Sequence, residues 1–148
     1  MADPDLQHMM QTTLALPGIL HSHAEHSAEE VMGGLMRLVT QFEAAREAVV
    51  LALRNKAPVD EIYTAIMATN PLASRYHAED LLAVSGNIFT SFTPLLGHDK
   101  TTLTPAASAD VMIWLRVLDQ TLVAARLLFQ TARLYGRAPN GKRLGETG

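Results

Sequence analysis

Two long stretches of this chain carry apolar residues at alternating steps of three and four, and this spacing constrains the fold more than any other feature. An α-helix turns once every 3.6 residues, so such steps gather the apolar side chains along one side of a helix. The stretches cover residues 28–54 and 105–136. We therefore predict an all-α fold, a helical bundle of four to five helices in which these two long helices pack antiparallel.

The ends of both long helices carry residues that typically begin or end a helix. Ser27 and Glu30 have the spacing of a capping box, which predicts that the first long helix begins at residue 28. Thr104 and Pro105 place a capping side chain before a proline at the first helical position. Gly136 fits the left-handed position that follows many helices. The second long helix is therefore predicted to end there.

Shorter helices are expected between the long ones. Pro58 suits the start of a helix over residues 59–69, Asn70-Pro71 ends it, and a further helix runs over residues 78–94. The pair Gly33-Gly34 is a flaw in the first long helix, because each glycine costs about 1 kcal/mol relative to alanine in a helix interior. A close helix crossing or a kink is predicted at this pair.

The helix over 105–136 has more apolar surface than one neighbour would cover. Between Val111 and Phe129 the charged residues are Arg116, Asp119 and Arg126. A helix covered on one side needs an apolar stripe of roughly 100°. Either this helix runs through the centre of the bundle, or its second face meets another protomer. For the second case the predicted interface residues are Trp114, Val117, Val123, Leu127, Leu128 and Tyr135.

The bundle, residues 28–136, is expected to lie between an N-terminal segment with a short helix, 1–27, and a flexible polar tail, 137–148. Asp3 and Asp5 stand where a secretory signal carries basic residues, so we expect a cytoplasmic location or a place within an assembled particle. The two longest uncharged stretches, residues 6–24 and 81–98, are interrupted by polar residues, and membrane insertion is therefore not expected.

The densest cluster of potential metal ligands lies just before the first long helix. If that helix began earlier, His23, His26 and Glu30 would share one face at positions i, i+3 and i+7. Imidazole and carboxylate groups there could hold zinc, nickel or iron(II). The ordinary alternative is a polar loop ahead of a helix start, and the cluster lacks the Glu-x-x-His pairs of di-iron bundles. We therefore expect no cofactor, with a divalent metal as the alternative.

A run of basic residues without an intervening acid occupies the end of the last helix and the tail. It could contact phosphate or an acidic partner, whereas cations near a helix C-terminus also stabilise the helix dipole without any ligand. A net charge of −3 and few aromatic residues argue against nucleic acid as the partner. The run consists of Arg126, Arg133, Arg137, Lys142 and Arg143.

The sequence contains no motif typical of an enzyme. Cysteine is absent, which excludes thiolate nucleophiles and cysteine-based metal sites. Nucleophile elbows, phosphate-binding glycine loops and dinucleotide fingerprints are also absent. We expect a non-enzymatic interaction or assembly protein, of the scaffold, adaptor, virion or secretion-chaperone type, that self-associates or docks through the apolar face of its last long helix. The alternative is a bundle that binds a metal or small ligand near His21–Glu30.

Overall fold

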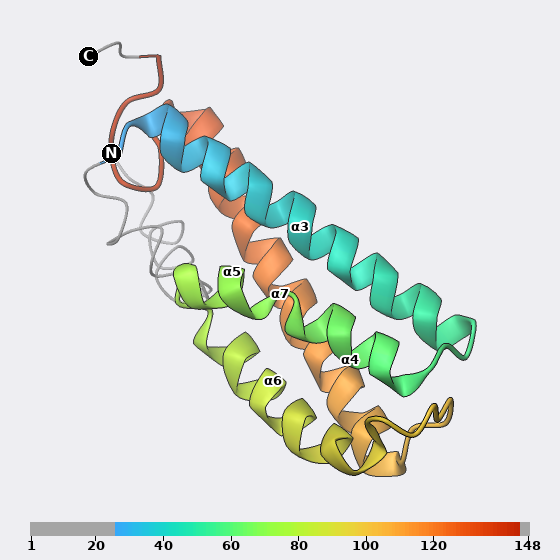
Figure 1. The fold of residues 1–148 in the computed structure, drawn as a ribbon. Helices are drawn as coiled ribbons and strands as arrows, with labels where there is room; N and C mark the ends of the chain where they lie inside the picture. Colours follow the sequence, from blue (N-terminus) through green and yellow to red (C-terminus); the bar gives the residue numbers. More distant parts are fainter. Residues whose placement is uncertain (1–25, 146–148) are drawn as a thin grey trace.

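The computed structural model describes residues 26–145, and these fold into an all-α helical bundle (Figure 1). The predicted fold class is therefore confirmed, and the two long helices run antiparallel. The predicted short helix within residues 1–27 lies outside the described residues. The elements are α3 (Ala28–Arg54), α4 (Val59–Met67), α5 (Asn70–Arg75), α6 (Glu79–Phe92), the 3-10 turn η1 (Thr93–Leu95) and α7 (Pro105–Tyr135).

The long helices begin and end where their capping residues predict. The Ser27 hydroxyl accepts a hydrogen bond from the backbone N–H of Glu30 at 3.1 Å and donates one to the Glu30 carboxylate at 3.2 Å. The Thr104 hydroxyl accepts from the backbone N–H of Ala107 at 3.1 Å. Gly136 has a φ of 66°, in the left-handed region that glycine adopts without strain. Each cap satisfies a backbone group that the helix itself leaves unpaired.

The core lies where α7 packs against α3 on one side and α6 on the other. The predicted apolar seams supply most of it, and burying a large apolar side chain contributes about 1.5–3 kcal/mol. The seam of α3 buries Val31, Leu35, Leu38, Phe42 and Val49. The seam of α7 buries Val111, Leu118, Leu122, Ala125 and Ala132.

The glycine pair in α3 combines a buried and an exposed position. A Cβ atom added at Gly34 would lie 2.6 Å from the hydroxyl oxygen of Tyr76, the residue that follows α5. At Gly33 an added Cβ would meet nothing within 4 Å. The close approach predicted for this pair is therefore made at Gly34. Helix α3 continues through both glycines.

The chain between α4 and α6 differs from the prediction. The helix that begins at Val59 ends at Met67, and Asn70-Pro71 begins α5 rather than ending helical structure. Proline suits the first turn of a helix because its missing N–H would have no partner there in any case. The dipeptide therefore separates two helices, and sequence reasoning recognised only the end of the first one.

Residues 137–145, which we predicted to be a flexible tail, are folded against the bundle. Arg137 and Arg143 pair through their backbones as an isolated antiparallel bridge, and Ala138 is buried. The Asn140 side-chain amide donates to the backbone carbonyl of His26 at 2.9 Å. This hydrogen bond joins the segment to the residue just before the α3 cap.

Candidate interaction surface on helix α7

Two of the predicted interface residues belong to the core and not to the surface. Trp114 is 0% exposed and Leu128 is 2% exposed. They are buried because α7 has two helical neighbours, α3 and α6, so a wide apolar face can be covered within one chain. The sequence also allowed α7 to run through the centre of the bundle, and this alternative explains why both side chains are buried. For Trp114 and Leu128 the interface prediction is therefore wrong.

The other four predicted interface residues retain accessible surface. Val117 and Leu127 are half-buried. Val123 is 61% exposed and Tyr135 is 51% exposed. Val123 lies on the outward side of α7, and a contact of these four residues with a partner stays a prediction.

Sequence reasoning missed three further exposed apolar residues on the same helix. They are Met112, Ile113 and Leu134, and Leu134 is 77% exposed. Trp114 and Leu128 were predicted as interface residues because they lie beyond the apolar seam that contains Leu118 and Ala125, yet the buried side of the helix is wide enough to include them. The eleven-residue spacing of Met112, Val123 and Leu134, which places them on one side of the helix, is the sequence signal that could have found two of these residues.

Two ion pairs connect α7 to α3 at the border of this surface. Arg46 donates from Nε to the Asp119 carboxylate at 2.6 Å, and Arg126 donates to the Glu43 carboxylate. All four side chains are nearly half exposed, so each pair contributes little stability, about 0–1 kcal/mol. They show the antiparallel register of the two helices, with residue 43 beside 126 and residue 46 beside 119.

A groove of about 480 Å³ runs beside these ion pairs between α3 and α7. Its charged lining contains three acidic and three arginine side chains, so no net charge gathers there to select an anion or a cation. The lining residues are Glu43, Arg46, Glu47, Val50, Leu51, Arg54, Asp119, Leu122 and Arg126.

A second groove, of about 380 Å³, lies over α3, α4 and the start of α5 and has no charged lining residue. Most of its lining side chains are alanines: Ala44, Ala45, Ala48, Ala65 and Ala68. Its one hydroxyl, that of Thr69, donates to the backbone carbonyl of Ile66 at 2.7 Å.

The predicted metal ligands are only partly brought together. His26 Nδ1 lies 2.8 Å from Glu30 Oε2, and His23 lies outside the described residues. Hydrogen bonds from His26 and then from Ser27 hold the pKa of the Glu30 carboxyl below its ordinary value. Over residues 26–145 there is no group of three histidine or acidic side chains that could hold a metal ion.

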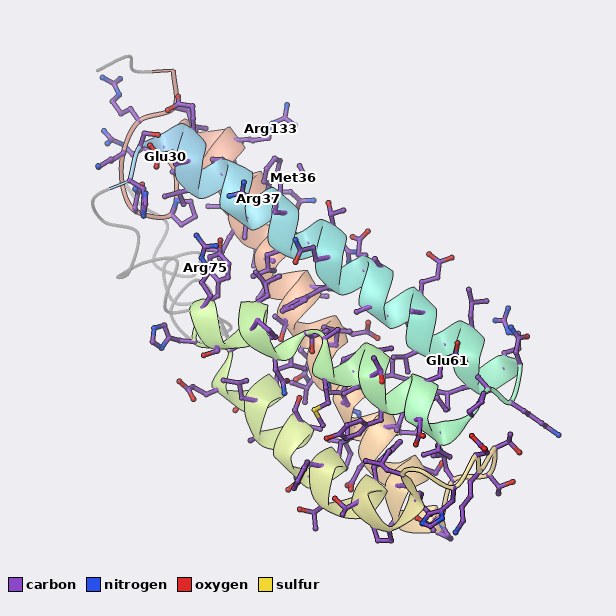
Figure 2. All side chains as sticks on the ribbon, in the orientation of Figure 1. Glu30, Met36, Arg37, Glu61, Arg75 and Arg133 are labelled. Atoms are coloured by element: carbon purple, nitrogen blue, oxygen red, sulfur yellow. The ribbon has the colours of Figure 1, made fainter. Side chains whose placement is uncertain are left out.

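The predicted basic residues do not converge on one site. Arg126 is paired with Glu43, and Arg137 donates to the backbone carbonyl of Gly141 at 3.1 Å. Arg133 extends from the last turns of α7 in Figure 2, and Lys142 and Arg143 are exposed on the folded-back segment. Arg133 lies in the last turn of α7, where a positive charge stabilises the helix dipole.

The described helices contain no stretch with both the length and the apolar character of a membrane span. Comparisons with protein-family models, with curated proteins and with solved structures give no match.

Proposed function

We propose that this protein is a non-enzymatic helical interaction protein that self-associates or docks on a larger assembly through the outward face of α7. The observation that carries the proposal is the concentration of large exposed apolar side chains on this one helix. Single exposed apolar residues are ordinary on a soluble protein, whereas a group of them is typical of an interaction surface. The group consists of Met112, Ile113, Val123, Leu134 and Tyr135.

The surroundings of these residues fit an interface with an apolar centre and a polar rim. The ion pairs Arg46–Asp119 and Arg126–Glu43 lie along the side toward α3 and are already satisfied within the chain. A partner that covers the apolar residues would therefore not leave these charges unpaired. This arrangement supports the class of scaffold, adaptor, virion component or secretion chaperone, acting in the cytoplasm or within an assembled particle.

Replacing Val123 by aspartate tests the proposal. Sedimentation and light scattering of the purified chain should show a mass above the 16.1 kDa of one chain at high protein concentration. Val123→Asp should return it to the monomer, because a charge at the centre of an apolar contact loses its water. Thr90→Asp is the matched control, since threonine has nearly the shape of valine and Thr90 is exposed on α6. A monomer at every concentration, unaffected by either change, would contradict self-association.

A second candidate is a divalent metal site, favoured by the 2.8 Å contact between His26 and Glu30. Protein purified without a nickel column should then contain zinc, nickel or iron, and added metal should raise the melting temperature. His26→Ala should remove both effects. Metal-free protein whose melting temperature does not respond to these ions would rule this candidate out.

A further inference from the structure

The exposed apolar residues of α7 follow an eleven-residue repeat along its outward side. Met112, Val123 and Leu134 are each separated by eleven residues and are 60%, 61% and 77% exposed. Arg116 and Leu127, also eleven apart, follow the first two by four residues. Eleven residues turn a helix by three full turns plus about 20°, so these side chains form a nearly straight stripe. We call Met112, Arg116, Val123, Leu127 and Leu134 the outer stripe.

The outer stripe has a centre of symmetry in its spacing. Val123 lies midway between Met112 and Leu134, at about 16 Å along the helix axis from each. When two copies of such a helix pack antiparallel about a two-fold axis through Val123, Met112 of each copy meets Leu134 of the other. The two valines meet each other on the axis. In a closed two-fold dimer, each exposed apolar residue of the stripe therefore faces an exposed apolar residue of the second copy.

The charges along α7 favour this antiparallel arrangement over a parallel one. With Val123 on the axis, Arg116 lies opposite Gln130 of the second copy, and Asp119 lies within one residue of Arg126 of the second copy. In a parallel, in-register pair, Arg116 would face Arg116 of the second copy. Like charges held together across an interface oppose association, so the parallel pair is disfavoured.

We propose that the outer stripe is the contact of an antiparallel two-fold homodimer centred on Val123. This inference rests on the proposed function and names the partner as a second copy of this chain. Asp119 then also lies opposite Leu127 of the second copy, where its charge remains compensated by Arg46 at 2.6 Å within its own chain.

The size of the stripe predicts a weak, concentration-dependent dimer. The outer stripe runs about 33 Å along the helix, from residue 112 to residue 134, and a helix with its side chains is about 10–12 Å wide, so the stripe covers roughly 350 Å². A stable interface of standard size buries about 800 Å² on each partner. The exposed side chains of Met36 and Leu51 on α3 flank the ion-paired stretch of that helix and can extend the contact.

Disulfide cross-linking tests the arrangement directly, because the chain has no cysteine of its own. Val123→Cys should form a covalent dimer on mild oxidation, since its two copies meet on the axis within the reach of a disulfide. Met112→Cys alone and Leu134→Cys alone should remain monomeric on a denaturing gel. An equimolar mixture of these two variants should form the mixed dimer. Thr90→Cys on α6 is the control for random collision, and circular dichroism of the matching serine variants checks that each chain folds.

The outcomes separate this inference from the proposed function. Efficient cross-linking of Met112→Cys to itself would show a parallel pair and overturn the arrangement while leaving self-association intact. A dimer by sedimentation whose Val123→Cys form does not cross-link would equally overturn it and place the contact elsewhere. A chain that stays monomeric and cross-links at no position would remove both this inference and self-association.

Discussion

The inward and outward faces of α7 have similar kinds of side chains and very different surroundings. The inward face buries Trp114, Leu118 and Leu128 in the core, whereas Val123 and Leu134 on the outward face remain in contact with water. The apolar content of the helix therefore does not distinguish a core from an interface. The number of neighbours that the fold supplies, and the angle around the helix axis, make that distinction.

Truncation of one residue on each face should give the largest contrast. Trp114→Ala should lower the free energy of unfolding by about 3–5 kcal/mol, because it leaves a large cavity in the core. Val123→Ala should change it by less than about 0.5 kcal/mol in dilute, monomeric protein, since most of its side chain is already exposed. Urea denaturation followed by circular dichroism measures both. Equal losses for the two variants would show that the two faces are not distinct.

The glycine pair of α3 allows the same comparison of a covered and an exposed position on a second helix. Gly34→Ala should destabilise the fold by about 1–3 kcal/mol, because the new methyl group collides with the Tyr76 hydroxyl. Gly33→Ala should instead stabilise it by up to about 1 kcal/mol, since alanine is the better helix former and meets no neighbour. Adding Tyr76→Phe should recover part of the Gly34→Ala loss. Thermal melts of the four chains test this, and a destabilising Gly33→Ala would contradict it.

The ion pairs at the border between the faces should have a smaller effect. A double-mutant cycle over Arg46→Ala and Asp119→Ala should give a coupling energy of about 0.2–1 kcal/mol, because both side chains are nearly half exposed. The coupling should shrink as salt is raised. A coupling several times larger and insensitive to salt would indicate that this border is covered in solution.

The smallest effect is expected at Glu30, whose side chain is exposed to water. Its lowered pKa means that the folded state holds the charged carboxylate more strongly than the unfolded chain does, through His26 and Ser27. That stabilisation is complete at neutral pH and is lost as the pH falls below the ordinary value of 4.5 and through the lowered pKa. Glu30→Gln should therefore lower the melting temperature slightly at pH 7 and leave it unchanged at pH 2. A larger difference at pH 2 than at pH 7 would contradict this assignment.

Local rules predicted the long helices because each rule concerns neighbouring residues. The capping side chains of Ser27 and Thr104 and the left-handed Gly136 act within one helical turn, so the sequence contains all the information needed. The apolar seams likewise follow from helix periodicity alone. These features decide the fold class and the ends of α3 and α7.

The candidate site depended on distant contacts that periodicity cannot supply. That Trp114 and Leu128 would be buried in the core, and that residues 137–145 would fold back onto the start of α3, are facts of tertiary packing. The hydrogen bond from Asn140 to His26 joins positions 114 residues apart. The sequence does not reveal this hydrogen bond, so a polar stretch rich in glycine and basic residues is predicted to be a flexible tail.

Trp114 is the single tryptophan of the chain, and its indole is shielded from water, with no hydrogen-bond partner for Nε1 among residues 26–145. Its fluorescence should accordingly be emitted at the short wavelengths of an apolar environment and shift to longer ones when the bundle opens. Because the outer stripe is on the opposite side of α7, contact between two copies should leave this emission nearly unchanged. The intrinsic fluorescence of the protein should thus report unfolding and change little on association.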